Sequence, residues 1–364
     1  MLEPARLRAL ADLSGPDRAF LSVYLDSDAD RGTLDVRAEQ VRSLLSGQPD
    51  EQEQFERNWS RAQELIDEHA IPADGAIGVF TCWATDLAHV EPIPVPVGAM
   101  LTVGAAPAVR PLYEVLDENQ PYAVAVVDAT AARIYSVSPD DAELERRVRG
   151  DVKNRVKVGG WSQKRYARRR EGELADYAST VAEALGALDA DSPFDRLVLL
   201  GSDEARQAVA EALPASLSDR VTGSEATASD ASEAELLDEA AELAAEGERA
   251  EEQTLWDEIV ELGLGGGLAV LGATPVLDAL VQARVEAMLL DREASLAATR
   301  CRACEALVHG TPDTCQTCGS SDVFETDLVE ALVELAVTTG ASVDFVDPFD
   351  ELTAQGHVAA LLRY

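Results

Sequence analysis

Two groups of residues in this chain have the types and spacing that chemistry requires, and the first is a set of cysteines. Cys301 and Cys304 form one Cys-x-x-Cys pair, Cys315 and Cys318 form a second, and ten residues with Gly and Pro separate the pairs. Four thiolates from two tight turns favour a closed tetrahedral Zn²⁺ site, which is structural because no position is left for water. This predicts a zinc ribbon at about residues 299–324. Disulfides or a redox pair are the alternatives, and His309 in the ribbon loop is a further potential ligand.

The second group is a basic segment from Arg146 to Arg170. It holds eleven of the 30 Lys and Arg residues, including every Lys, and a single acid, Asp151, although the formal net charge of the chain is -37. A basic segment in an acidic chain is an electrostatic footprint for a polyanion, and nucleic acid is the first candidate. The alternative is a solvated basic helix face whose charges pair with acids elsewhere on the surface.

Two glycines, Gly159 and Gly160, lie at the centre of this segment. Glycine weakens a helix and lets the backbone approach a partner closely, so the pair predicts an exposed tip. Residues 146–158 alternate charged residues with valine and predict a strand or extended arm that enters the tip. Residues 163–188 have helical apolar spacing and predict a helix that leaves it. A glycine tip between two basic arms suits insertion into a narrow, phosphate-lined space.

The sequence GGWSQKRYARRRE resembles the central-domain signature of the archaeal and eukaryotic class-one peptide chain release factors, GGQS-x-x-R-[FY]-x-R-x-R. The residues that match in register are Gly159, Gly160, Ser162, Arg165, Tyr166, Arg168 and Arg170. Trp161 stands where that family has its catalytic Gln. Gly160 to Gln163 also fits the G-x-x-Q pattern of the Vms/Ankzf-type peptidyl-tRNA hydrolases, which are related to the release factors. The last nine residues, GHVAALLRY, are similar to the G-G-I-G-x-x-L-R-Y end of the release-factor carboxy-terminal domain.

The resemblance implies hydrolysis of peptidyl-tRNA at the peptidyl transferase centre of the large ribosomal subunit. Gly159 and Gly160 would allow entry, and the Gln163 amide would position water near the ester. The residues that would contact ribosomal RNA or tRNA are Lys153, Arg155, Lys157, Trp161, Lys164, Arg165, Arg168, Arg169 and Arg170. Arginine suits this role because its planar fork binds phosphate at two points. A translational GTPase is a further candidate partner.

The first part of the chain lacks the motifs by which release factors read stop codons. Neither an N-I-K-S loop nor a Y-x-C-x-x-x-F segment occurs, and residues 101–105 (LTVGA) stand where the second would lie. The resemblance therefore implies codon-independent ribosome rescue. The first alternative is a non-catalytic occupant of the ribosomal A site, like Pelota-type rescue factors or release-factor-like hibernation factors. The second is an RNA-binding module that kept the fold and does not act on the ribosome.

The elements that position these groups predict a mixed α/β fold of the α+β type in three domains. The boundaries predicted are residues 1–117, 118–245 with the glycine tip, and 246–364 with the ribbon. Residues 221–232 are rich in Ser, Ala and acids and predict a solvated loop. Residues 233–262 predict one long helix, and residues 326–339 predict another. Cys82 is isolated and is expected to be a small buried apolar residue.

Composition adds expectations about the environment. The chain has 67 Asp and Glu, a pI near 4.3, and only three Lys among its 30 basic residues. This balance resembles proteins from halophiles that accumulate salt, and the alternative is an acidic protein from a high-GC genome. The sequence contains no apolar run long enough to cross a membrane and no signal peptide, so a soluble cytoplasmic protein is expected.

Overall fold

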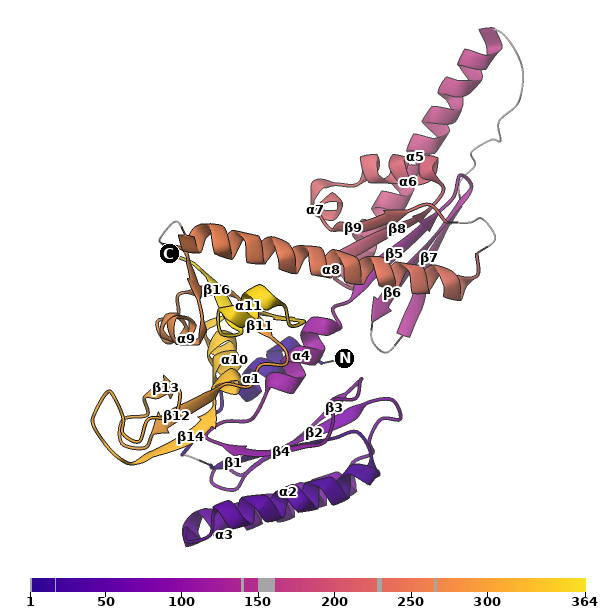
Figure 1. Ribbon diagram of the computed structural model, residues 1–364. Helices are drawn as coiled ribbons and strands as arrows, with labels where there is room; N and C mark the ends of the chain where they lie inside the picture. Colours follow the sequence, from indigo (N-terminus) through magenta and orange to yellow (C-terminus); the bar gives the residue numbers. More distant parts are fainter. Residues whose placement is uncertain (1, 17, 139–140, 150–160, 228–230, 265–266) are drawn as a thin grey trace. The chain divides into compact units, whose positions relative to one another are not determined.

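A computed structural model describes residues 2–16, 18–138, 141–149, 161–227, 231–264 and 267–364. Helices and strands alternate along these residues and build four separate sheets, so the predicted mixed α/β class is confirmed (Figure 1). The chain divides into two compact units. The outer unit consists of Met1–Glu118 and Thr254–Tyr364, and the central unit consists of Asn119–Gln253. The three-domain division remains a prediction.

The central unit is built on one five-stranded sheet with the strand order β7-β6-β5-β8-β9. Its strands are β5 (Tyr122–Val127), β6 (Ala131–Ser138), β7 (Asp141–Arg149), β8 (Arg196–Gly201) and β9 (Val221–Glu225). Strands β5, β6 and β7 form an antiparallel meander, whereas β8 is parallel to β5 and β9 is parallel to β8. The continuous apolar sequences of β5 and β8 are typical of strands that are covered on both faces.

Helices cover both faces of this sheet (Figure 1). They are α5 (Trp161–Asp191), α6 (Asp203–Ala212), the short α7 (Ala215–Ser218) and α8 (Glu233–Leu264). On one face, Tyr177 and Val181 of α5 pack with α6 against alternate residues of β5, β6 and β8. On the other face, Leu236 and Ala240 of α8 pack against the remaining alternate residues, which include Val124. The two faces follow from the alternation of side chains along a strand.

The predicted loop at residues 221–232 is wrong over its first five residues, which form the edge strand β9. The segment reads as a loop because its sequence, VTGSE, has a single large apolar residue. Pairing with β8 nevertheless provides hydrogen-bond partners for its backbone N–H and C=O groups. Gly223 leaves no room for a side chain, because a Cβ there would lie 2.7 Å from the Leu243 Cβ. The long helix predicted at residues 233–262 is confirmed as α8. Helix α5 begins at Trp161 rather than Gln163, and β7 begins earlier than predicted, at Asp141.

The outer unit contains an antiparallel sheet with the order β3-β2-β1-β4. The elements around it are α1 (Pro4–Ala11), β1 (Phe20–Leu25), η1 (Asp28–Asp30), α2 (Arg31–Leu44), α3 (Pro49–Glu68), β2 (Ala76–Cys82), β3 (Leu87–Ile93), β4 (Met100–Gly104) and α4 (Arg110–Glu118). Residues of α2 and α3 pack on one face, against β1 and β2. Cys82 is fully buried beside Ala19 and Phe20, which confirms its predicted apolar role.

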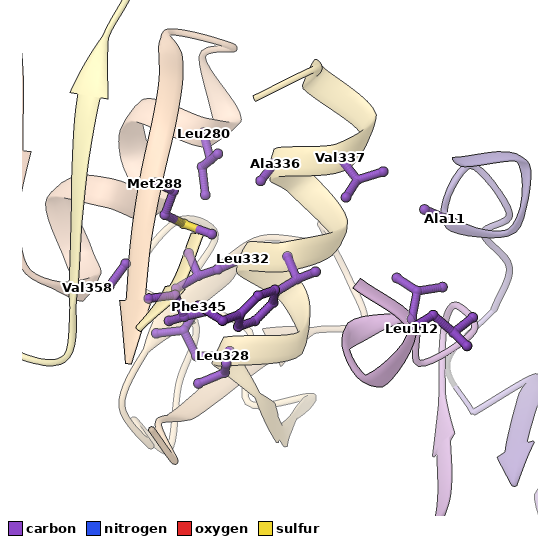
Figure 2. Packing of buried hydrophobic residues seen from close by; sticks show 14 of the residues in the cluster. Ala11, Leu112, Leu280, Met288, Leu328, Leu332, Ala336, Val337, Phe345 and Val358 are labelled. Carbon is purple, nitrogen blue, oxygen red and sulfur yellow. The ribbon is translucent and has the colours of Figure 1, made fainter. Parts of the chain in front are cut away.

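The second sheet of the outer unit has the order β10-β16-β11-β15. Its elements are β10 (Ala269–Leu271), α9 (Ala273–Val281), β11 (Val285–Asp291), α10 (Leu328–Thr339), β15 (Ser342–Val346), α11 (Asp350–Ala354) and β16 (Val358–Leu362). Leu328 and Leu332 of α10 pack against Met288 and Phe345 of this sheet (Figure 2). Helices α1 and α4 join the same apolar core from the other side of α10.

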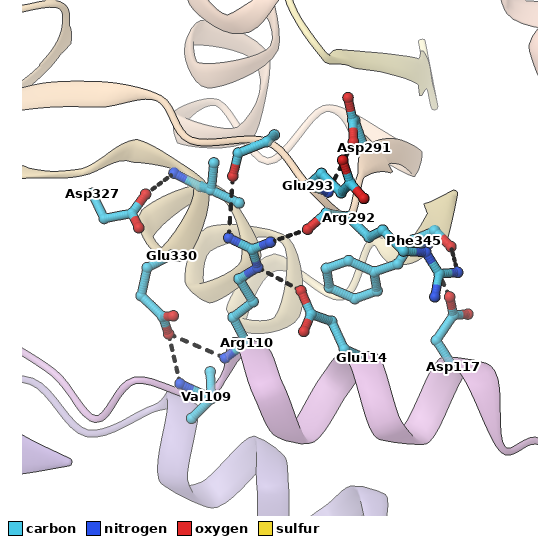
Figure 3. Close-up of polar contacts among 12 residues, drawn as sticks. Val109, Arg110, Glu114, Asp117, Asp291, Arg292, Glu293, Asp327, Glu330 and Phe345 are labelled. Atoms are coloured by element: carbon cyan, nitrogen blue, oxygen red, sulfur yellow. Dashed lines mark hydrogen bonds and ion pairs between the residues drawn. The ribbon is translucent and has the colours of Figure 1, made fainter. Parts of the chain in front are cut away.

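Helix α10 begins two residues later than predicted because β14 (Val323–Asp327) occupies the preceding residues. The Asp327 carboxylate caps the helix by accepting a hydrogen bond from the Val329 N–H at 2.8 Å. In the first turn of α10, one carboxylate oxygen of Glu330 accepts hydrogen bonds from the backbone N–H groups of Val109, at 2.6 Å, and Arg110, at 3.2 Å (Figure 3). Glu330 thereby connects α10 to the start of α4. Burial raises the pKa of this carboxyl to about 8.

None of the helices that the structure describes is both long enough and apolar enough to cross a membrane.

Candidate functional site

The four cysteines lie on two turns that have the same backbone hydrogen bonds. In the first turn, the Cys301 N–H donates to the Ala306 carbonyl and the Glu305 N–H donates to the Cys301 carbonyl. The second turn repeats this pattern with Cys315 as its first cysteine. Strands β12 (Ala297–Cys301) and β13 (Leu307–His309) flank the first turn, and β14 follows the second. The predicted ribbon therefore contains two equivalent zinc-knuckle turns.

The sulfur positions fit a tetrahedral metal site. The Cys301 and Cys318 Sγ atoms are 3.6 Å apart, as are those of Cys304 and Cys315, and all four ligand atoms lie within 4.8 Å of one another. Zn–S bonds of about 2.3 Å in a tetrahedron place the sulfurs about 3.8 Å apart. A disulfide requires about 2.05 Å, so the spacing fits a shared ion and not a covalent pair. The cysteines can therefore hold a metal ion.

The local backbone also favours the thiolate form that a metal requires. The N–H of Cys318 is the main cause that lowers the pKa of the Cys315 thiol, to about 6. Hydrogen bonds among the cysteines instead raise the pKa of the Cys304 and Cys318 thiols, against the effect of their backbone hydrogen bonds. His309 lies outside the four-sulfur cluster, and its Nδ1 is 3.2 Å from the Thr274 hydroxyl. The guanidinium of Arg302, between the first two cysteines, stacks on Phe324 at 4.8 Å.

Much of the predicted loop site falls outside the described residues. Lys153, Arg155, Lys157, Gly159 and Gly160 lie in the range 150–160, which the structure does not describe. The residues placed by their backbone alone, in the first turns of α5, are Trp161, Gln163, Lys164 and Arg165. Helix α5 continues past the edge of the sheet toward these residues (Figure 1). The predicted catalytic and RNA-contacting roles remain predictions.

The last three arginines of the basic segment, Arg168 to Arg170, differ in their ion pairs. Arg170 binds Glu204 of α6, with Nη2 and Oε2 2.7 Å apart, and Arg169 binds Glu173 one turn later in α5, at 2.8 Å. The Arg168 side chain is exposed and has no ion pair within the described part of the chain. Arg169 and Arg170 therefore fit the alternative to RNA binding, in which the basic charges pair with acids of the same protein. Of these three arginines, Arg168 is the one without an ion pair among the described residues.

Comparison with known proteins adds to this geometry. Residues 107–245 match the family model for bacterial archaeo-eukaryotic release factor family 10. Residues 107–245 are therefore release-factor-like. The matched range contains the whole central sheet and the basic segment, so the relationship to the release-factor superfamily that the sequence predicted is confirmed. The finer likeness to Vms/Ankzf-type hydrolases remains a prediction. No curated protein matches the chain.

Several solved structures also match this chain, each at low sequence identity. The archaeal translation termination factor aRF1 is 17% identical over 100% of this chain and 99% of its own, with a TM-score of 0.28. Archaeoglobus fulgidus Pelota is 16% identical over 81% of both chains, with a TM-score of 0.35. S. cerevisiae Dom34, described as a translation termination-like factor, is 12% identical over 80% of both chains, with a TM-score of 0.42.

Sequence reasoning missed one feature of the central unit, a cluster of three arginines. Arg147 and Arg149 belong to the basic segment, but the chemistry was assigned only to the residues after them. The structure places both on β7 beside Arg133 of β6, and all three line one cavity. The available signal was the alternation of charge along 146–149, which directs Arg147 and Arg149 to one face of a strand. Their proximity to Arg133 depends on strand register, which the sequence did not specify.

Proposed function

We propose that this protein is a codon-independent ribosome rescue factor that hydrolyses peptidyl-tRNA on stalled ribosomes or large subunits. The observation that carries the proposal is the release-factor family match over residues 107–245, which encloses the basic segment and its Gly159-Gly160 tip. The proposed partners are the peptidyl transferase centre with its ribosomal RNA, peptidyl-tRNA, and a translational GTPase for delivery. The proposed location is the cytoplasm.

The proposed reaction is hydrolysis of the ester between a peptide and the terminal ribose of tRNA. It needs a positioned water and donors for the developing oxyanion, and the ribosomal site supplies most of that environment. The factor therefore needs no strong acid or base, which agrees with a tip that contains glycines and amides. Gln163 would orient the water with its amide group. Trp161 would stack on an RNA base, a contact worth about 1–3 kcal/mol, and Arg168 would bind phosphate.

The remaining parts fit supporting roles. The first domain, proposed as residues 1–117, has no stop-codon motif and would occupy the decoding site without reading it. The ribbon in the third domain, proposed as residues 246–364, would hold a structural Zn²⁺ through Cys301, Cys304, Cys315 and Cys318. That ion would cross-link the two knuckle turns and take no part in hydrolysis. The acidic surface would serve as an adaptation to high intracellular salt.

A second function has an observation in its favour. Trp161 stands where the release factors carry their catalytic Gln, and an indole ring can neither accept a hydrogen bond from water nor donate two. A protein that uses this tip only for contact would be a non-catalytic occupant of the ribosomal A site, acting in rescue or hibernation. Gln163 distinguishes the two functions, because a catalyst needs its amide and an occupant tolerates alanine.

The test is peptide release from large subunits that carry stalled peptidyl-tRNA, in buffer with high potassium. Wild type is compared with Gln163→Ala, and Gln207→Ala is the matched control because it removes an exposed amide from α6, outside the basic segment. Co-sedimentation with ribosomes is measured for all three proteins. If the protein is a hydrolase, the wild type and Gln207→Ala release peptide. Gln163→Ala does not release peptide, although it still sediments with ribosomes.

Two other outcomes separate the alternatives. Binding by all three proteins without release by any of them refutes the hydrolase and supports the A-site occupant. Failure of the wild type to sediment with ribosomes or large subunits at high potassium refutes both functions. An RNA-binding role away from the ribosome would then be the remaining hypothesis.

A further inference from the structure

A polar cavity of about 490 Å³ opens at one edge of the central sheet. Its walls come from the ends of β5 and β8, from β6 and β7, and from the residues near the start of α8. The lining residues that matter for its chemistry are Arg133, Arg147, Arg149, Ser202, Thr227 and Leu236. Strands β5, β8 and β9 are parallel, and the cavity lies at their carboxyl ends. This edge is the usual ligand position in sheets of parallel strands.

Strand register brings the three arginines together. Arg133 of β6 is directly opposite Arg147 of β7 in the antiparallel ladder, and Arg149 is opposite Ala131, two residues along. Residues opposite each other share a face, and so do residues two apart on one strand. All three guanidinium groups therefore belong to the face that α8 covers. Like charges directly opposite each other destabilise a strand pair, so the arrangement carries an electrostatic cost that a bound anion would remove.

Acidic groups do little to neutralise this cluster, although the chain is strongly acidic. Arg133 has one carboxylate nearby, Glu233, at 3.9 Å, which is close to the limit for an ion pair. Arg147 and Arg149 make no ion pair among the residues that the structure describes. Asp128 also lines the cavity, and its carboxylate accepts a hydrogen bond from the N–H of Ala129. The cavity thus concentrates positive charge in a chain whose formal net charge is -37.

The lining indicates what kind of anion fits. Arginine forks bind phosphate oxygens at two points, and the hydroxyls of Ser202 and Thr227 add neutral donors on the other side of the cavity. The remaining wall is apolar, from Val126 and Leu236. A volume of a few hundred Å³ with a polar rim and an apolar wall suits a mononucleotide. We propose that this cavity binds a nucleotide through its phosphate, with the base against the apolar wall.

This proposal concerns a site apart from the glycine tip and does not depend on ribosome binding. Two sources of the ligand share the same chemistry: a free nucleotide, and the terminal nucleotide of an RNA strand. The two are distinguished by titration of the full chain with adenosine monophosphate and with a five-nucleotide single-stranded RNA, each followed by calorimetry. Competition by the monophosphate against the RNA then tells whether both occupy one cavity.

The strand supplies its own matched control. Arg146 precedes Arg147 on β7, carries the same charge, and is opposite Ile134, whose side chain packs on the α5 face. Arg147→Glu and Arg146→Glu therefore change the net charge equally and differ only in the face that they alter. Arg149→Gln is a milder second variant that keeps the proposal testable if Arg147→Glu fails to fold. Thermal unfolding of each variant checks that the sheet is intact.

We expect Arg147→Glu to weaken nucleotide binding about tenfold or more, as the loss of a charge-assisted contact predicts. Arg149→Gln is expected to weaken binding to a lesser extent, and Arg146→Glu to change it less than about twofold. Binding of RNA alone, with the same ranking of variants, identifies the RNA end as the ligand. Equal losses for Arg146→Glu and Arg147→Glu would overturn the proposal, because general charge would then explain them. Absence of binding by both ligands at about 1 mM would overturn it as well.

Discussion

The Glu330 carboxyl gives this protein a specific dependence of stability on pH. Burial raises its pKa to about 8, with a further increase from the charge of Asp327, whereas the N–H groups of Val109 and Arg110 oppose the shift (Figure 3). An exposed glutamate in an unfolded chain titrates near 4.3. Between these two values the folded state holds the proton and the unfolded state releases it. Stability therefore falls as pH rises from about 4.3 to about 8.

The perturbation is Glu330→Gln. Both backbone hydrogen bonds reach the same carboxylate oxygen, so the amide oxygen of glutamine can accept them, while the titration disappears. Linkage predicts that glutamine stabilises the fold relative to wild type by about 4 kcal/mol at pH 7 and about 1 kcal/mol at pH 5. Removal of the acceptor, in Glu330→Ala, should instead cost about 1 kcal/mol as a lost helix cap.

The assay is urea unfolding followed by circular dichroism at pH 5, 6, 7 and 8 in constant potassium chloride. Glu325→Gln is the control, because Glu325 is exposed on β14 and its removal also deletes one negative charge. The predicted result is a stability gap between Glu330→Gln and wild type that widens with pH, while the gap for Glu325→Gln stays nearly constant. A gap for Glu330→Gln that does not change between pH 5 and pH 8 would refute the reasoning.

Three further predictions concern the metal, the backbone and the basic segment. Purified protein should contain about one zinc per chain by elemental analysis, and Cys315→Ser should lose the metal and lower the melting temperature, since structural zinc contributes folding energy. Gly201→Ala should prevent stable folding, because φ is +119° there and a Cβ would lie 1.9 Å from a β5 carbonyl oxygen. Gly186→Ala, in open space within a helix, should instead stabilise by up to about 1 kcal/mol in urea unfolding. Arg170→Ala should lower the melting temperature with little direct effect on RNA affinity, whereas Arg168→Ala should weaken RNA binding and leave melting unchanged, as an RNA shift assay with parallel melts would show.

Local sequence signals predicted the long helices correctly. The helix predicted at residues 233–262 is α8, and the helix predicted at residues 326–339 is α10. Two Cys-x-x-Cys pairs predicted the sulfur cluster because knuckle turns are local structures with a fixed hydrogen-bond pattern. These features depend on residues that are close in the sequence, so periodicity and spacing are sufficient to identify them.

Features that depend on distant residues were not predictable in the same way. The edge strand β9 has few apolar residues and forms because its backbone hydrogen-bonds to the neighbouring strand β8. Arg170 belongs to a basic run, yet its partner Glu204 is on another helix, so the run alone could not show which arginines were already paired. The opposition of Arg133 and Arg147 likewise depends on the register of two strands. Tertiary context decided each of these cases.

The position of β16 in its sheet has a consequence for how this protein is made. This strand lies between β10 and β11, in the middle of the sheet, and its Val358 and Ala360 belong to the apolar core that also contains α1 and α4. Vectorial synthesis delivers these residues after almost everything they pack against. A nascent chain that stops before residue 358 leaves the central groove of the sheet open and the core around α10 incomplete. Chains that end before residue 358 are therefore expected to be open to proteases, because the outer unit is protected only when β16 is present.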